Sequence, residues 1–292
     1  MSERISPLLA LKINLQAEPI VLRLLETPRS DIASLCGRVL DGSYDKPFIL
    51  DTGRERCLHF HLDSVQSAMD LDDPDRLSVA YTRKMMAFLL FNSAPQRILL
   101  LGLGGGSLAK FCYRRLPAAT ITAVEMNPDV IALRDEFRIP ADDERFRVVC
   151  DESTNYVNGL GPRKDVILAD ACDGAGVAPQ LNSVDFFENA RRRLSPGGVF
   201  VMNLCGDNFG SADHLVKIRR AFGEFLTLRV SEDGNIIVIA LKEDRFDIRW
   251  RQLENRAIEL KGQYELEFPQ FVRRLALHLR LRRWWPRQYG PV

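Results

Sequence analysis

Long hydrophobic runs are absent from this chain of 292 residues, so no membrane-spanning helix is expected. An excess of one sign of charge is absent too. Forty basic and 39 acidic residues give a formal net charge of +1, which leaves no strong overall attraction to nucleic acid or to an anionic membrane. Internal repeats and low-complexity segments are also missing. We therefore expect a soluble, cytoplasmic protein whose partners are neither nucleic acids nor membranes.

Closely spaced cysteine pairs are missing as well. The six cysteines are scattered without a C-x-x-C motif, and several fall within apolar segments. This distribution favours reduced thiols that fill the core, as in proteins of the cytoplasm. Histidine is scarce: His59 and His61 share one face of an expected strand, but no third ligand is evident. No metal site is predicted.

What the chain does contain is an alternation of apolar and amphipathic segments. Seven apolar segments lie at 98–102, 120–125, 146–150, 165–170, 198–204, 226–231 and 235–241. With helical patterns between them, they predict an α/β fold with a seven-stranded, methyltransferase-type Rossmann-like sheet. The short turn at 232–234 is too tight for a parallel crossover, so the last strand is expected to run antiparallel.

The regions flanking this alternation differ in pattern. Apolar segments split by turn signals predict a small N-terminal antiparallel β region over residues 1–75. Residues 76–243 are predicted to form the Rossmann-like nucleoside-binding catalytic domain, led by a helix at 76–92 that Asp73 and Pro74 start. Residues 244–292 are predicted to form a basic helical C-terminal extension. Its arginines suit phosphate or lipid contact, although a solvated or subunit-facing helix is the simpler interpretation.

The first strand of the predicted sheet runs into a glycine cluster. Gly102, Gly104 and Gly106 permit a tight turn and close approach of the backbone to a ligand, and the helix from Ser107 directs free N–H groups toward it. Glu125 ends the next strand, about twenty residues further on, where a carboxylate accepts hydrogen bonds from both ribose hydroxyls. This G-x-G-x-G spacing is typical of S-adenosylmethionine-dependent enzymes, whereas nicotinamide-binding loops have their third glycine one position later. The motif predicts an adenosine-type ligand.

Acidic residues follow the next strand ends. Asp151 and Glu152 follow the third strand, and Asp170 ends the fourth, with Asp173 close behind it. Ligands of open α/β sheets lie beyond the carboxyl ends of the strands, so these groups are expected to converge. Asp151 suits the adenine amino group, while Asp170 and Asp173 suit a cationic amine and its proton. Alternatively, Asp151 and Asp173 only cap the helices that follow. Cys172 lacks a base partner and is predicted to be a bystander.

These motifs resemble the spermidine synthases, which are polyamine aminopropyltransferases. The resemblance extends over residues 99–204, and the segment 170–190 follows the acidic gate-loop motif of the family (DSxDPxGPA) without a gap. It implies a decarboxylated S-adenosylmethionine donor, a diamine acceptor, an N-terminal β domain and a homodimer or larger assembly. It also implies residue roles. Gln66, Glu125, Asp151 and Glu152 would hold the nucleoside, Asp170 would accept the proton, and Asp173 would help to bind the amine.

The resemblance breaks down on the acceptor side. Gly105 stands where the family has an aspartate that binds the ammonium group of the donor, and Tyr81-Thr82-Arg83 replaces the usual Tyr-His-Glu. Losing a carboxylate and gaining a cation both disfavour a long polycation. Tyr81 and Arg83 are therefore predicted to line an altered acceptor pocket.

Three functions fit these observations. The leading prediction is a spermidine synthase-like transferase that moves an aminopropyl group from an S-adenosyl donor to an amine, with Asp170 as proton acceptor. The second is a methyl- or 3-amino-3-carboxypropyltransferase that uses S-adenosylmethionine itself, whose carboxylate would pair with Arg83. The third is a catalytically silent nucleoside-binding protein. Because Asp170 and Asp173 are both present, the first is preferred over the third.

Overall fold

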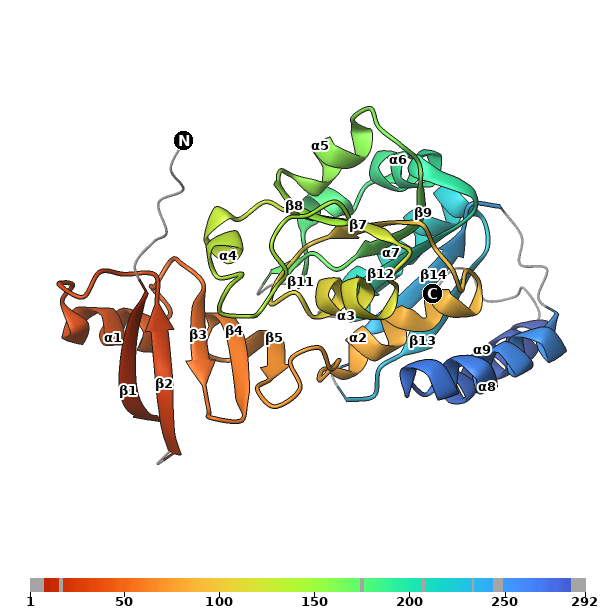
Figure 1. Cartoon of the computed structure of the whole chain (residues 1–292). Coiled ribbons are helices and arrows are strands. Elements are labelled where there is room, and N and C mark those ends of the chain that lie inside the picture. The colour runs from red at the N-terminus through yellow and green to blue at the C-terminus, as the bar shows by residue number, and fades with distance from the viewer. Residues whose placement is uncertain are drawn as a thin grey trace.

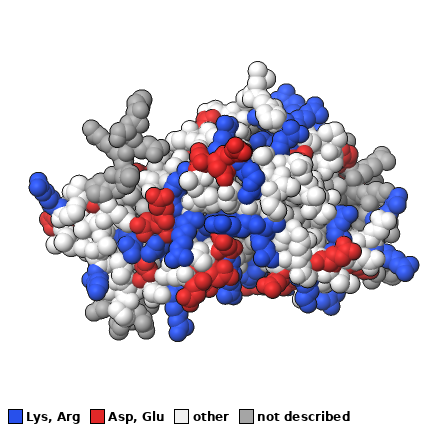
Figure 2. All heavy atoms as spheres, in the orientation of Figure 1, with Lys and Arg blue, Asp and Glu red and all other residues white. Residues whose placement is uncertain are grey.

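The structure, a computed structural model, describes residues 8–15, 18–173, 176–205, 208–232, 234–243 and 249–284. Two sheets lie side by side, a five-stranded sheet from the N-terminal residues and a seven-stranded sheet from the rest, with a pair of C-terminal helices at the far end (Figure 1). Acidic and basic side chains are interspersed over the face seen in Figure 2, in keeping with the small net charge. Within the described residues, no helix combines the length and apolarity that a membrane span requires.

The N-terminal sheet is antiparallel throughout, as expected. Its strands lie in chain order, β1 (Leu9–Leu15), β2 (Glu18–Leu24), β3 (Phe48–Asp51), β4 (Glu55–His61) and β5 (Ser64–Asp70). A helix that the sequence analysis did not predict, α1 (Ile32–Leu40), lies between β2 and β3. The Asp31 side chain caps it by accepting hydrogen bonds from the N–H groups of Ala33 and Ser34. Leu35 and Val39, its buried side chains, lie four positions apart, so the helical spacing was present in the sequence but was not recognised.

The main sheet has the order β13-β14-β12-β9-β6-β7-β8. Its strands are β6 (Arg97–Leu101), β7 (Thr120–Glu125), β8 (Phe146–Cys150), β9 (Lys164–Ala169), β12 (Leu194–Leu204), β13 (Phe225–Arg229) and β14 (Ile236–Leu241). β14 runs antiparallel to both of its neighbours and the remaining pairs are parallel, which confirms the predicted strand directions. The strand order reverses between β6 and β9.

Helices cover both faces of the main sheet (Figure 1). Ile98 and Leu100 of β6 belong to the apolar cluster on one face, and Leu99 and Leu101 belong to the cluster on the other. The first cluster includes side chains of α3 (Ser107–Arg115) and α4 (Pro128–Ala132), and the second those of α5 (Ser153–Asn158), α6 (Val184–Arg193) and α7 (Asn208–Phe222). Burial on both faces explains why β6 is apolar at successive positions.

The helix that leads into the main sheet is shorter than predicted. It consists of α2 (Ala80–Met85) and the 3-10 helix η1 (Met86–Leu90). The expected start at Asp73 and Pro74 is wrong, because Asp70 accepts the N–H groups of Asp72 and Asp73 and folds this segment into a turn instead.

Two helices follow the main sheet, α8 (Trp250–Tyr264) and α9 (Phe268–Trp284). Their buried faces extend the apolar cluster that contains η1. Between them, Glu265 adopts the left-handed conformation, with φ of 59°. The arginine-rich end of the tail has side chains outside the described part of the structure, so its role stays a prediction.

Candidate active site

A cavity of about 1310 Å³ opens beyond the carboxyl ends of β6, β7, β9 and β12. It lies at the point where the strand order reverses, which is where open α/β sheets bind their ligands. The main sheet supplies its floor, while residues of β4, β5 and α2 supply further walls. The N-terminal sheet and the main sheet therefore enclose this cavity together.

The glycine loop forms one wall of the cavity. A Cβ on Gly102 would lie 2.2 Å from the backbone oxygen of Asp170, so a larger residue would push the two strand ends apart. Gly102 and Gly104 line the cavity, whereas Gly106, in the left-handed conformation, precedes α3 and packs against Ile139. The loop thus brings the start of α3 toward the cavity, with its first N–H groups free for a ligand.

Glu125 is held in place by backbone groups of the loops on either side. One carboxylate oxygen accepts the N–H of Leu103 at 3.0 Å, and the other accepts the N–H of Asn127 at 2.9 Å. The side chain is partly exposed and lines the cavity. Each oxygen retains acceptor capacity for a ribose hydroxyl. The residues of the glycine loop and Glu125 therefore fit the nucleoside end of an S-adenosyl compound.

The other predicted nucleoside-binding residues are placed less directly. Gln66 lines the cavity from β5 and donates a hydrogen bond to the hydroxyl of Ser64 at 3.1 Å. Asp151 lies beside Glu125, since its N–H donates to the Glu125 carbonyl at 3.1 Å, but the cavity wall reaches Ser153 rather than Asp151 or Glu152. The contacts of Asp151 and Glu152 with a nucleoside stay predictions.

Asp170 lies in the cavity with both carboxylate oxygens held. The hydroxyl of Tyr81 donates to Oδ2 at 3.1 Å, and the side-chain amide of Asn203 donates to Oδ1 at 2.9 Å. Burial raises the pKa of Asp170 above the usual value of an aspartate, and the hydrogen bonds from Asn203 and Tyr81 oppose that rise. A carboxylate with a raised pKa accepts a proton more readily, which suits a general base.

Asn203 is a site residue that the sequence analysis missed. It ends β12 and lines the cavity, and its Oδ1 is buried without a hydrogen-bond partner among the described residues. A signal was available, because Asn203 is a polar residue near the end of an apolar strand, the same position in the fold that singled out Asp170.

Arg83 lies away from this cavity, which corrects the expectation that it lines the acceptor pocket. Its guanidinium donates to the carbonyls of Leu77 and Ser78 at 2.9 and 2.8 Å, and Nε lies 3.7 Å from the Glu267 carboxylate. Tyr81 and Arg83 are two positions apart on α2, so the helix directs their side chains to different sides. Tyr81 faces Asp170, and Arg83 faces the C-terminal helices.

Gly105 is explained by its neighbour Ser67. A Cβ at position 105 would lie 2.7 Å from the Ser67 hydroxyl and 3.0 Å from the ring of Phe137. The Ser67 hydroxyl is also 3.4 Å from that of Ser107, so the two form a neutral polar wall. An aspartate therefore does not fit at position 105 unless Ser67 moves or becomes smaller.

Cys172 and Cys205 form a disulfide bond, contrary to the expectation that the cysteines are reduced. Of the others, Cys112 is buried, Cys150 is exposed, and Cys36 and Cys57 are partly buried free thiols. The sequence analysis missed the pair because 33 residues separate the two cysteines, although the strands that precede them, β9 and β12, are neighbours in the sheet.

The side chain of Asp173, the residue after Cys172, lies outside the described part of the structure, so its role stays a prediction.

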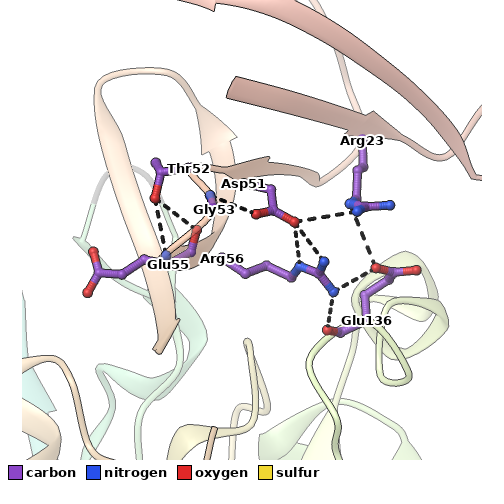
Figure 3. Close-up of polar contacts among 7 residues, drawn as sticks. All are labelled: Arg23, Asp51, Thr52, Gly53, Glu55, Arg56 and Glu136. Carbon is purple, nitrogen blue, oxygen red and sulfur yellow. Dashed lines mark hydrogen bonds and ion pairs between the residues drawn. The ribbon is translucent and has the colours of Figure 1, made fainter. Parts of the chain in front are cut away.

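An ionic cluster fastens the N-terminal sheet to the main sheet (Figure 3). Arg56 of β4 lies 2.7 Å from the Asp51 carboxylate and 2.9 Å from the Glu136 carboxylate, and Arg23 of β2 lies 3.4 Å from Asp51. Arg56 also donates to the backbone carbonyl of Glu136 at 2.7 Å. Because Glu136 follows α4, these contacts hold the sheet that carries Gln66 against the domain that carries Glu125.

Comparisons with known proteins agree with this geometry. Residues 78–224 match the family described as Spermine/spermidine synthase domain. The Polyamine aminopropyltransferase of Chromobacterium violaceum is 40% identical over 229 residues, which cover 78% of this chain and 88% of that protein.

Two solved structures share the fold. A probable spermidine synthase from Corynebacterium glutamicum is similar with a TM-score of 0.60 and 21% identity, over 73% of this chain and 84% of the other. A spermidine synthase in complex with the transition state analogue AdoDATO is similar with a TM-score of 0.54 and 18% identity, over 69% and 72%. At these identities the likeness establishes the fold.

Proposed function

We propose that this chain, which belongs to the spermine/spermidine synthase family, transfers an aminopropyl group from an S-adenosyl donor to an amine. One observation carries the proposal. Asp170 lies in the cavity with its two oxygens fixed by Tyr81 and Asn203, in the same cavity wall as Glu125. The site therefore combines a nucleoside-binding carboxylate with a base that an incoming amine can reach.

The reaction requires the amine to lose a proton. The amine nitrogen attacks the methylene carbon next to the sulfonium sulfur, and the carbon–sulfur bond breaks with its electron pair moving to sulfur. Before the attack, Asp170 accepts a proton from the ammonium form of the amine, which frees the nitrogen lone pair, and the neutral thioether 5′-methylthioadenosine leaves after it. Holding the nitrogen in line with the breaking bond supplies much of the rate.

The walls of the cavity favour a decarboxylated donor. A donor that kept its carboxylate would need a cation, but Arg83 lies elsewhere and Lys46, which lines the cavity, lies 2.9 Å from Glu26. Acidic side chains on the cavity wall would repel such a carboxylate; they are Asp45, Asp63, Glu125 and Asp170. A donor tail that ends in an ammonium group avoids this repulsion.

The acceptor is proposed to be a small diamine. The carboxylate of Asp170, which lines the cavity, offers an acceptor for the reacting nitrogen. The homodimer that the family resemblance implies is part of the proposal, and sedimentation of the purified chain tests it.

Release of 5′-methylthioadenosine tests the function. The purified chain is incubated with decarboxylated S-adenosylmethionine and, in turn, with putrescine, cadaverine and spermidine, and the nucleoside product is quantified. Product with at least one amine, and a strong preference for the decarboxylated donor over S-adenosylmethionine, are expected. Arg83→Ala serves as a control that keeps this donor preference. Absence of product with every amine contradicts the proposal, and S-adenosylhomocysteine as the product would indicate methyl transfer instead.

A further inference from the structure

We propose that Cys172 and Cys205 form a modification site that small thiols and disulfides of the glutathione class oxidise and reduce, and that its oxidation state sets the affinity for the amine. The second part of this inference rests on the proposed function. Both cysteines line the cavity and are partly exposed, so a small molecule can reach them through the same opening as the substrate.

The two cysteines continue the register of the sheet past the catalytic aspartate. Ala169 of β9 pairs with Met202 of β12. One residue further along both strands, Asp170 accepts the hydrogen bond from Asn203, and two residues beyond that Cys172 is bonded to Cys205. The hydrogen bond and the disulfide are therefore successive cross-links between the same two chain segments.

The disulfide also contacts the amide that holds the base. The Nδ2 of Asn203, which donates to Asp170, lies 4.0 Å from Sγ of Cys172. A change at this sulfur acts directly on the Asn203 side chain. Of the six cysteines, this pair is thus the one in contact with the catalytic machinery.

Cys172, which lines the cavity, begins a short hairpin. This hairpin pairs β10 (Cys172–Asp173) with β11 (Gly176–Val177). A hydrogen bond from the Ala178 N–H to the Ala171 carbonyl, at 3.0 Å, also joins the two ends of the hairpin. A ladder of two residue pairs is weak on its own. The disulfide supplies a covalent attachment at the root of the hairpin.

The chemistry is an ordinary thiol–disulfide exchange. From the reduced pair, the thiolate of one cysteine attacks a sulfur of glutathione disulfide, whose S–S bond breaks to release one glutathione thiolate. The second cysteine thiolate then attacks the mixed disulfide and releases the second glutathione. Two electrons pass from the cysteines to glutathione disulfide, and the two protons that the cysteines lose are taken up by the departing thiolates.

Oxidation should favour amine binding without changing donor binding. The disulfide fixes Cys172 beside Asn203, so the amide that holds Asp170 is already ordered before the amine arrives and less conformational entropy is lost on binding. The disulfide between Cys172 and Cys205 does not include any residue of the donor end of the cavity, which the glycine loop and Glu125 form. We expect reduction to raise the KM for the amine by about three- to tenfold, the scale of ordering a few side chains, and to leave the KM for the donor within about twofold.

Peptide mapping without reductant tests the site independently of activity. Trypsin releases Cys172 in the fragment 165–191 and Cys205 in the fragment 194–217, each with one cysteine. After the full chain is equilibrated with glutathione disulfide, the two fragments are expected to run as one cross-linked species that reductant separates. Hydrogen exchange of the Ala178 N–H, which donates to the Ala171 carbonyl, is expected to be faster in the reduced protein.

Variants connect the site to catalysis. Cys172→Ser and Cys205→Ser are both expected to show the higher KM for the amine that the reduced enzyme shows. Added glutathione disulfide is expected to leave this KM unchanged in both variants. Cys36→Ser removes a free, partly buried thiol in α1 and is expected to keep the full response. The inference is overturned if no cross-linked fragment forms at any glutathione ratio, or if oxidised and reduced enzyme have the same amine KM. If no amine is a substrate, the proposed function fails. Peptide mapping and hydrogen exchange then still decide whether the two cysteines form a redox-sensitive site.

Discussion

The donor end and the acceptor end of the cavity are assembled in different ways. The donor end is built largely from one βα turn and the next strand end, with backbone N–H groups that hold Glu125. The acceptor end gathers Tyr81, Asp170 and Asn203, side chains that are far apart in the chain. Local backbone geometry therefore decides the first, and strand order decides the second.

The largest expected effect is at the acceptor end. Asp170→Asn removes the proton acceptor but keeps the size of the side chain, so kcat should fall by about 10²- to 10⁴-fold. Affinity for 5′-methylthioadenosine, measured by calorimetry, should not change. A matching loss of nucleoside affinity would show that the two ends are not separable.

The same variant has a second, thermodynamic consequence. Burial raises the pKa of Asp170 in the folded chain above its pKa in the unfolded chain. At pH values between these two pKa values, the folded state binds the proton more tightly than the unfolded state does. The free energy of unfolding therefore falls as the pH rises through this window. Above the window Asp170 is buried as a destabilising anion. Asp170→Asn should therefore unfold at a higher temperature than the parent at pH 7, and the difference should disappear below the unfolded pKa. Thermal unfolding at several pH values measures this.

At the donor end, a substitution should mainly change the KM for the donor, whereas Asp170→Asn mainly changes kcat. Glu125→Gln replaces a carboxylate that accepts two N–H groups with an amide that can accept fewer. The KM for the donor should rise by about 10- to 100-fold, the scale of a lost charged hydrogen bond, while the KM for the amine stays within about twofold. A comparable rise in both constants would contradict the separation of the two ends.

A smaller effect is expected at the ionic cluster that joins the two sheets. Arg56→Ala leaves the partly buried Asp51 and Glu136 without their closest cation, and should lower the free energy of unfolding by about 1–3 kcal/mol. Urea denaturation measures the loss. Arg76→Ala, which breaks an exposed pair with Asp70, is the control and should cost less than about 1 kcal/mol. Equal losses would mean that the cluster in Figure 3 is no stronger than a surface pair.

The smallest effect concerns pH dependence. The hydrogen bond from Tyr81 lowers the pKa of Asp170, so Tyr81→Phe should raise it further. Activity falls as pH drops through this pKa, because the base becomes protonated, and the acidic limb of kcat/KM should shift to higher pH by less than about one unit. Tyr113→Phe removes a tyrosine–aspartate hydrogen bond elsewhere, to Asp143, and should leave the limb in place.

Much of the main sheet could be predicted because its signals are local. Seven apolar segments became the seven strands within a few residues, and the short turn at 232–234 correctly indicated the antiparallel strand. Errors arose where a local signal was overlooked or had a competitor. The helical spacing of Leu35 and Val39 in α1 was overlooked. Asp73 and Pro74, which resemble a helix start, lie in a turn organised by Asp70.

The amino-acid pattern alone established the fold class, the glycine loop and the row of acids at the strand ends, because each depends on neighbours along the chain. Tertiary structure decided the rest. It joined Asp170 to Asn203 and brought Cys172 against Cys205. The physical reason is that hydrophobic periodicity specifies which face of an element is buried, whereas a polar contact depends on which strand becomes the neighbour, and that is settled by packing of the whole chain.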